Sequence, residues 1–178
     1  MSNHVTMLSM LETERGIQGC HLFAYSSKAL PSLEIIGMGR RGKMLKEKII
    51  YWLKRKNVRL LPLKYVVCLE HDLLPTTDDE DNFRWLELPS LLLVLQLAEQ
   101  LQLSSPHRCF CAGKLALNGE WIFPEEIKDE KNLAEFLVKY GDTVLMNEKL
   151  FSNFFGRDHF KRIDLTELME DVGNIYRK

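Results

Sequence analysis

The segment 88–103 is apolar on nearly every side of a predicted helix, and it constrains the fold more than any other feature of the chain. Its leucines leave no continuous polar face, so a helix built from this segment must be buried. Pro89 fits the first turn, where the missing N–H costs nothing. Because such a helix needs a layer to cover it, we expect it to pack against a sheet.

Apolar runs with alternating or β-branched residues predict that sheet. We expect 17–25 and 33–36 to form one hairpin, and 65–69 to form a third strand. Asn118-Gly119 is a type I′ turn signal, which predicts a second hairpin between 108–117 and 121–123.

Helices and strands alternate in the remainder of the chain. We expect a helix over 43–56, a polar acidic loop over 76–82, a helix over 132–140, a strand over 143–146, a short helix through Phe151, and a last helix over 164–173 capped by Asp164 or Thr166. Hairpins first and alternation later predict an α+β fold, with a mixed sheet packed by helices.

The chain has 178 residues, of which 46% are hydrophobic. We therefore expect one globular domain over 1–178, with 1–15 as a candidate flexible N-terminal extension. The first residues lack the pattern of a signal peptide, and no apolar run reaches the length of a membrane span. These observations predict a cytoplasmic protein without a membrane partner.

The segment 34–50 has the shape of a phosphate-binding loop, with Gly37, Gly39, Gly42 and Lys43 satisfying parts of two nucleotide motifs. Met44 stands where the first motif needs a hydroxyl for Mg²⁺, and no acidic residue follows where the second motif needs one. We therefore interpret this segment as a strand–turn–helix corner that uses glycine for its backbone geometry, and we expect no nucleotide cofactor.

Charge is unevenly distributed, although the formal net charge is only −1. This balance excludes a histone-like protein held to nucleic acid by global charge. Within 40–64, ten residues are basic and Glu47 alone is acidic. The candidate nucleic-acid-binding residues are Arg40, Arg41, Lys43, Lys46, Lys48, Lys54, Arg55, Lys56 and Arg59. A solvated helix face balanced by the acids of 78–81 is the alternative interpretation.

The apolar stripe of the helix over 43–56 contains Leu45, Ile49, Trp52 and Leu53. Because Trp52 belongs to this stripe, we expect no aromatic stacking platform among the basic residues. Any binding of nucleic acid should then be independent of its sequence.

Four cysteines lie in strand-like apolar segments, which predicts reduced and buried thiols. His107, Cys109 and Cys111 alternate onto one face of the predicted strand over 108–117. The spacing lacks the C-x-x-C turn of a zinc knuckle and a second ligand pair, so we expect no metal.

Five short segments, in order, resemble the N-terminal Lon-protease-like domain of the magnesium-chelatase subunit I/ComM family. They are Gly16-Ile17, L-P-S-L-E-I-I-G at 30–37, V-V-C-L with D-L-L-P at 66–75, Phe83 with L-E-L-P at 86–89, and C-A-G-K-L-A-L-N-G at 111–119. The resemblance covers 16 to about 173 and implies the ribosomal-protein-S-five domain-2-like fold shared with Lon. In that family the segment after the first glycine corner binds no nucleotide, and a separate AAA+ module holds ATP.

Lon-type proteases use a serine–lysine pair, and the resemblance puts Glu87 at the serine position and Lys128 at the lysine position. Glu87 cannot perform that acyl transfer. Ser90 lies one turn further along, but the glycine-rich turn that supplies oxyanion donors is missing. We therefore expect no enzyme activity; a degenerate peptidase and a nucleotide-binding loop are the less favoured interpretations.

A non-catalytic interaction module remains as the expected function class. The resemblance implies an accessory to a DNA-processing or AAA+ machine, since the family domain accompanies a hexameric motor that acts on DNA. From the basic residues we add non-specific binding of DNA or RNA as part of this expectation. The alternative is a module for protein binding or self-association without nucleic acid, for which Phe151, Phe154 and Phe155 are candidates.

Overall fold

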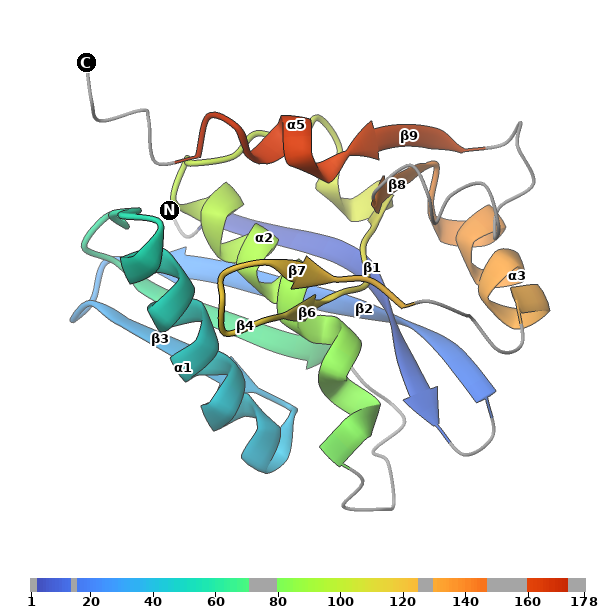
Figure 1. Ribbon diagram of the computed structural model, residues 1–178, viewed down its shortest axis with the longest axis horizontal. Coiled ribbons are helices and arrows are strands. Elements are labelled where there is room, and N and C mark those ends of the chain that lie inside the picture. The colour runs from blue at the N-terminus through green and yellow to red at the C-terminus, as the bar shows by residue number, and fades with distance from the viewer. Residues whose placement is uncertain (1–2, 14–15, 71–79, 125–129, 147–159, 173–178) are drawn as a thin grey trace.

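The computed structural model describes residues 3–13, 16–70, 80–124, 130–146 and 160–172 (Figure 1). The strands are β1 (Asn3–Thr13), β2 (Gly16–Ser27), β3 (Ser32–Ile36), β4 (Lys64–Glu70), β5 (Cys109–Phe110), β6 (Lys114–Leu115), β7 (Trp121–Ile122), β8 (Thr143–Met146) and β9 (Lys161–Asp164). The helices are α1 (Gly39–Arg55), α2 (Glu87–Leu97), α3 (Glu130–Tyr140) and α5 (Leu165–Met169), together with the short 3-10 helices η1 (Glu80–Leu86) and η2 (Pro106–Arg108).

Seven strands form one sheet in the order β3-β4-β2-β1-β5-β8-β9. β2 runs antiparallel to its two neighbours, β1 and β4, whereas the other neighbouring pairs are parallel. With helices packed on this mixed sheet, the structure agrees with the predicted α+β class.

The predicted hairpin between 17–25 and 33–36 is wrong. β3 pairs with β4 in parallel, with Ile35 opposite Val67. The strands are parallel because α1, which lies between them in the sequence, returns the chain to the end of the sheet at which β3 begins. The antiparallel partner of β2 is β1 along its whole length, from Asn3 opposite Ser26 to Thr13 opposite Gly16.

A flexible extension over 1–15 is also wrong for residues 3–13, which form β1. This strand lies inside the sheet between β2 and β5. Met7, Leu8, Met10 and Leu11 are all buried, so β1 is covered on both faces. Because both faces are buried, apolar and polar residues do not alternate along β1, and Thr6 and Ser9 interrupt the apolar run, so the strand signal is weak.

α2 lies between the sheet and the two-stranded hairpin β6–β7, which crosses in front of it in Figure 1. The N–H of Leu88 donates to the carbonyl oxygen of Gly113 at 2.9 Å, and the N–H of Gly113 donates to Trp85 at 3.0 Å. A Cβ on Gly113 would lie 2.6 Å from Leu88 Cδ2, so a larger residue at position 113 would force the Leu88 side chain to move. Covered by the sheet and the hairpin, α2 buries every residue except Gln96, in agreement with its apolar pattern.

The central helix ends at Leu97, earlier than predicted. Glu99 adopts a positive φ of 59°, and the N–H of Gln100 donates to Leu95 at 2.9 Å, so the chain leaves the helix through a left-handed residue. Leu101 and Leu103 remain buried beyond that point, which accounts for the longer apolar pattern.

The two faces of the sheet carry different helices. Ile35, Val67 and Ala24 stand side by side on one face, and Gly42 of α1 packs against Ile35 there. A side chain at position 19 would point to the opposite face, which α3 covers. A Cβ on Gly19 would lie 2.3 Å from two atoms of the Phe136 ring of α3.

The later elements follow the prediction in part. The predicted strand over 108–117 divides into β5, which joins the large sheet, and β6, which pairs with β7. The hairpin turn is present, but it is not the predicted type I′ turn, because Gly119 has a positive φ of +86° and Asn118 does not. β8 and α3 are confirmed, α5 is shorter than predicted, and the Asp164 side chain caps it by accepting from the N–H of Thr166 at 2.7 Å. The predicted helix through Phe151 lies outside the described residues.

Candidate nucleic-acid interface

The glycines between β3 and α1 form a strand-to-helix corner. Gly37 has a φ of +88°, and a Cβ there would lie 3.1 Å from the carbonyl oxygen of Leu69. α1 already begins at Gly39, so Gly42 and Lys43 lie within the helix. The positive φ of Gly37 and Gly39 and the close contact between Gly42 and Ile35 agree with the predicted strand–turn–helix corner.

The predicted apolar stripe of α1 is confirmed. Leu45, Ile49, Trp52 and Leu53 are buried, and the Trp52 ring N–H donates to the carbonyl oxygen of Gly119 at 3.1 Å. This stripe fixes the rotation of the helix about its axis, so the opposite side of α1 faces solvent.

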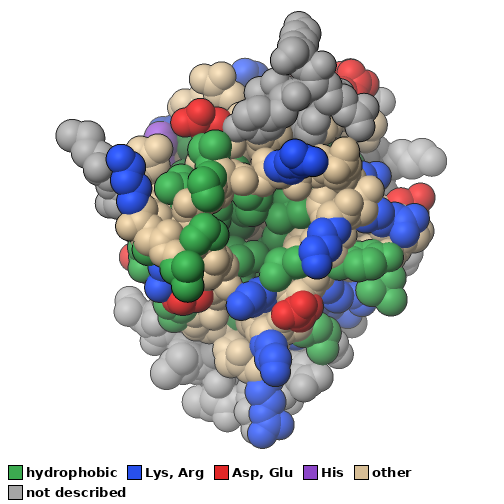
Figure 2. Space-filling view, turned by 90° about the vertical axis from the view of Figure 1, so that its left-hand side faces the viewer, with side chains coloured by type: hydrophobic (Ala, Val, Ile, Leu, Met, Phe, Trp, Pro, Cys, Tyr) green, Lys and Arg blue, Asp and Glu red, His purple; other side chains and the backbone are tan. Residues whose placement is uncertain are grey.

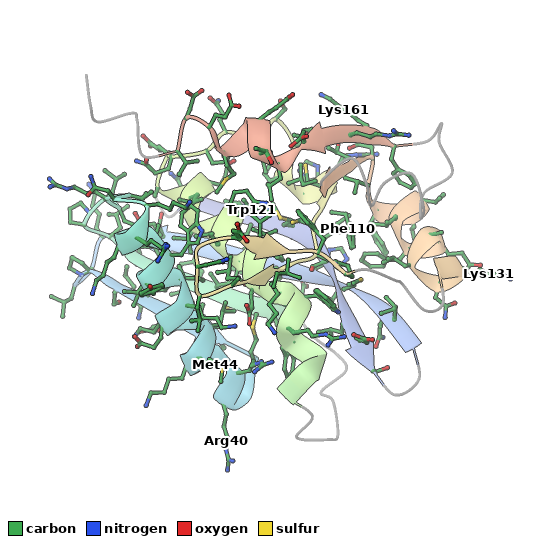
Figure 3. All side chains as sticks on the ribbon, in the orientation of Figure 1. Arg40, Met44, Phe110, Trp121, Lys131 and Lys161 are labelled. Carbon is green, nitrogen blue, oxygen red and sulfur yellow. The ribbon has the colours of Figure 1, made fainter. Side chains whose placement is uncertain are left out.

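The nine candidate basic residues divide into two groups. Arg41, Lys46 and Lys48 are half-buried. The exposed basic residues, which we call the cationic set, are Arg40, Lys43, Lys54, Arg55, Lys56 and Arg59. Figure 3 shows the Arg40 side chain extending away from the body of the protein at the start of α1.

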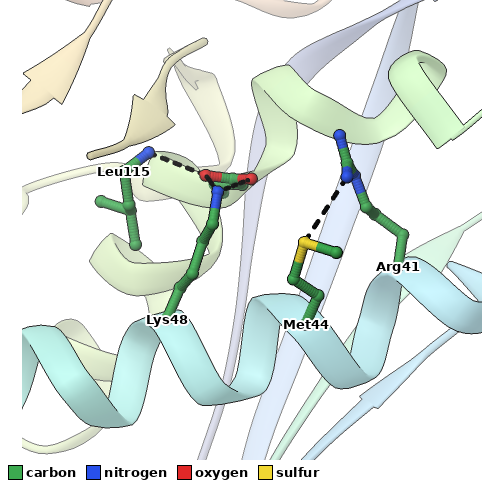
Figure 4. A network of polar contacts seen from close by, with 5 residues as sticks. Arg41, Met44, Lys48 and Leu115 are labelled. Carbon is green, nitrogen blue, oxygen red and sulfur yellow. Dashed lines mark hydrogen bonds and ion pairs between the residues drawn. The ribbon is translucent and has the colours of Figure 1, made fainter. Parts of the chain in front are cut away.

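Lys48 points inward and pairs with Glu87 at the start of α2. Its Nζ lies 2.8 Å and 3.1 Å from the two carboxylate oxygens, and the N–H of Leu115 donates to one of them at 2.8 Å (Figure 4). Side-chain exposure is 17% for Lys48 and 2% for Glu87. Lys48 is thus a structural ion-pair partner, and its inclusion among the candidate phosphate-binding residues is not supported by its position.

Arg41 is half-buried rather than exposed, at the border of the exposed side of the helix. Its Nη1 contacts Met44 Sδ at 3.6 Å, as Figure 4 shows. Because Arg41, Lys46 and Lys48 are half-buried, the basic side chains most open to a ligand are those of the cationic set.

The cationic set has no carboxylate partners in the part of the chain that the structure describes. The ion pairs found there join Lys48 to Glu87, Lys64 to Glu34, Arg84 to Glu12 and Arg108 to Asp142. The side chains of the acidic residues at 78–81, which could balance the charge of the set, are not described by the structure. On the described surface, Glu47 is the acid that shares the exposed side of α1.

An aromatic side chain does lie among these basic residues, contrary to our expectation. Tyr51 is 48% exposed, and its hydroxyl accepts from Arg55 Nη1 at 3.4 Å. Met44 is 45% exposed, two turns earlier on the same side of α1. Both residues fall outside the buried stripe, so their exposure could have been predicted from the helical periodicity. Figure 2 shows Lys and Arg side chains over the side of the molecule on which α1 ends, with hydrophobic side chains between them.

Two of the three residues considered for peptidase chemistry, Ser90 and Glu87, are buried, and Glu87 is also engaged in other contacts. Ser90 is fully buried within α2, and its Oγ has no hydrogen-bond partner among the residues that the structure describes. Glu87 is held by Lys48 and Leu115. Lys128 lies outside the described residues.

His107, Cys109 and Cys111 do not share one face of a strand as the alternation predicted. His107 is exposed within η2, whereas Cys109 and Cys111 are buried. Burial raises the pKa of Cys109 to about 11 and raises that of Cys111 further. Across the described ranges, no three His, Cys, Asp or Glu side chains come together as metal ligands would.

Comparison with known proteins returns neither a matching family model nor a matching curated protein. None of the helices in the described parts is long and apolar enough to cross a bilayer.

Proposed function

We propose that this chain is a non-catalytic binding module that holds DNA or RNA by its phosphate backbone, through the cationic set on and after α1. The observation that carries this proposal is the exposure of six basic side chains with no ion pair to any described carboxylate. Each phosphate contact by such a side chain releases a condensed counterion, which favours binding at low salt.

The binding should not depend on base sequence. Sequence readout requires side chains held against base edges in a groove, whereas exposed lysine and arginine on a convex helix reach phosphates. α1 has 17 residues and is about 25 Å long, which is enough to follow several successive phosphates.

The proposal extends to the fold family and the assembly. We propose a ribosomal-protein-S-five domain-2-like fold and a role as an accessory to an AAA+ or other DNA-processing machine. Two features support this: α2 begins at Glu87, where the central helix of the resembling family begins, and Gly113 of the segment C-A-G-K-L-A-L-N-G packs on Leu88.

A charge-reversal experiment tests the binding. Lys43, Lys54 and Lys56 are changed together to Glu, and affinity for labelled DNA and RNA is measured by fluorescence anisotropy at low salt. The matched control changes Lys131, Lys139 and Lys161, which are exposed on α3 and β9. Both triple variants change the net charge equally, so the comparison separates a local site from global charge.

We expect the α1 variant to lose binding and the control variant to retain most of it, because the cationic set is local. Circular dichroism should show unchanged folding in both, since none of the six side chains is buried. Equal losses in the two variants would contradict the proposal. The absence of any complex with wild-type protein would favour a module for protein binding or self-association.

A further inference from the structure

We infer that the preferred ligand of α1 is single-stranded nucleic acid, with an unpaired base stacking on Tyr51. This inference rests on the proposed function and adds the ligand's strandedness and the residue that selects it. The observation behind it is the position of one exposed aromatic ring among exposed cations.

Tyr51 lies within the cationic surface rather than beside it. Lys54 and Arg55 follow it by one helical turn and are both exposed, and Met44 precedes it by two turns with 45% exposure. Phosphate-binding side chains and apolar surface therefore alternate along one side of a single helix. Single-strand binding sites combine these two components: cations that track the backbone and rings on which bases stack.

Arg55 holds the tyrosine from one side. Its Nη1 donates to the Tyr51 hydroxyl at 3.4 Å, and its Cδ would lie 3.1 Å from a Cβ placed on Gly119. The arginine side chain thus lies against the β6–β7 turn and reaches to the tyrosine hydroxyl at its end. A ring positioned in this way loses less conformational freedom when a base stacks on it.

The geometry favours single strands over duplexes for a steric reason. In a duplex, both faces of every internal base are covered by neighbouring bases, so a ring on the convex surface of a helix reaches only the backbone. An unpaired base presents an open face to the ring, and stacking of this kind tolerates any base. Duplex DNA would use the cations alone.

Fluorescence anisotropy with two labelled probes tests the inference. The probes are a thymidine strand of about 20 nucleotides and a duplex of the same length, both at low salt. The variants are Tyr51→Ala, which removes the ring, and Tyr51→Phe, which keeps it. Tyr140→Ala is the matched control, because Tyr140 is 39% exposed but lies on α3.

We expect wild-type protein to bind the single strand more tightly than the duplex. Tyr51→Ala should weaken single-strand binding by about tenfold and leave duplex binding within about twofold, whereas Tyr51→Phe and Tyr140→Ala should resemble wild type. Equal affinity for both probes, with no effect of Tyr51→Ala, would overturn the inference and leave the proposed function intact. Failure of wild-type protein to bind either probe would overturn both.

Discussion

Lys48 of α1 and Glu87 of α2 form an ion pair that also holds the hairpin β6–β7. The Lys48 Nζ contacts both carboxylate oxygens, and the carboxylate accepts a further hydrogen bond from the N–H of Leu115. Glu87 is the first residue of α2, where a negative charge interacts favourably with the helix dipole. One buried carboxylate therefore joins the helix that carries the cationic set to the central helix and to the layer above it.

Replacing Glu87 with Ala should destabilise the fold by about 3–5 kcal/mol. The change leaves the Lys48 ammonium largely buried without a partner and leaves the Leu115 N–H without an acceptor. Urea unfolding monitored by circular dichroism measures the loss. A cost below about 1 kcal/mol would contradict a structural role for the pair.

Two further variants separate the ion pair from general effects of substitution. Lys54→Met removes an exposed lysine from the same helix and should change stability by less than about 0.5 kcal/mol. Lys48→Met combined with Glu87→Gln removes both charges and should be more stable than Glu87→Ala, because no buried charge stays unpaired. If the free-energy changes of Lys48→Met and Glu87→Gln, each measured alone, add up to that of the double variant, the two residues are not coupled.

Gly19 tests the packing of α3 on the sheet. Gly19→Ala should cost about 1–3 kcal/mol, since the added Cβ would overlap the Phe136 ring. The melting temperature should fall by about 2–4 °C for each kcal/mol lost. Combining it with Phe136→Leu should restore part of the stability, and Gln18→Ala at the neighbouring position should have little effect. A melting temperature unchanged by Gly19→Ala would place α3 elsewhere.

Stability should decline as pH rises above about 9, because burial raises the pKa of the folded thiols. The pKa of Cys109 is raised from 9.0 to about 11, and the pKa values of Cys20 and Cys111 are raised further. Between these values the unfolded chain loses thiol protons that the folded chain keeps, so unfolding becomes more favourable. Urea midpoints at pH 8 and pH 10 measure the decline, which should be smaller in Cys20→Ala with Cys111→Ala. An equal loss of stability in that variant would show that ionisable groups other than these two thiols cause the decline.

Local features of this fold were predictable, but strand partners were not. The stripe of α1 and the buried α2 follow from helical periodicity, and Asp164 follows from capping chemistry. The pairing of β3 with β4 depends on contacts between distant segments, which local patterns do not encode. β1 was missed because polar residues such as Thr6 and Ser9 interrupt its apolar run.

The candidate interface was predictable as a charged segment but not residue by residue. Lys48 borders the apolar stripe, three residues after Leu45 and four before Trp52, but only the position of Glu87 shows that it forms an inward-facing ion pair. Charge counting also overlooked Tyr51, although its place off the apolar stripe predicts exposure. Whether a charge is buried or free depends on which element packs against it, and that is a property of the tertiary structure.

The salt dependence of binding to single-stranded nucleic acid tests the cationic set most directly. If all six exposed side chains contact phosphates, the logarithm of the binding constant should fall against the logarithm of salt concentration with a slope approaching about −4. Lys54→Ala should reduce the magnitude of this slope by about 0.7, and Lys131→Ala on α3 should leave it unchanged. A slope near zero, or equal effects of the two substitutions, would contradict a phosphate-binding surface on α1.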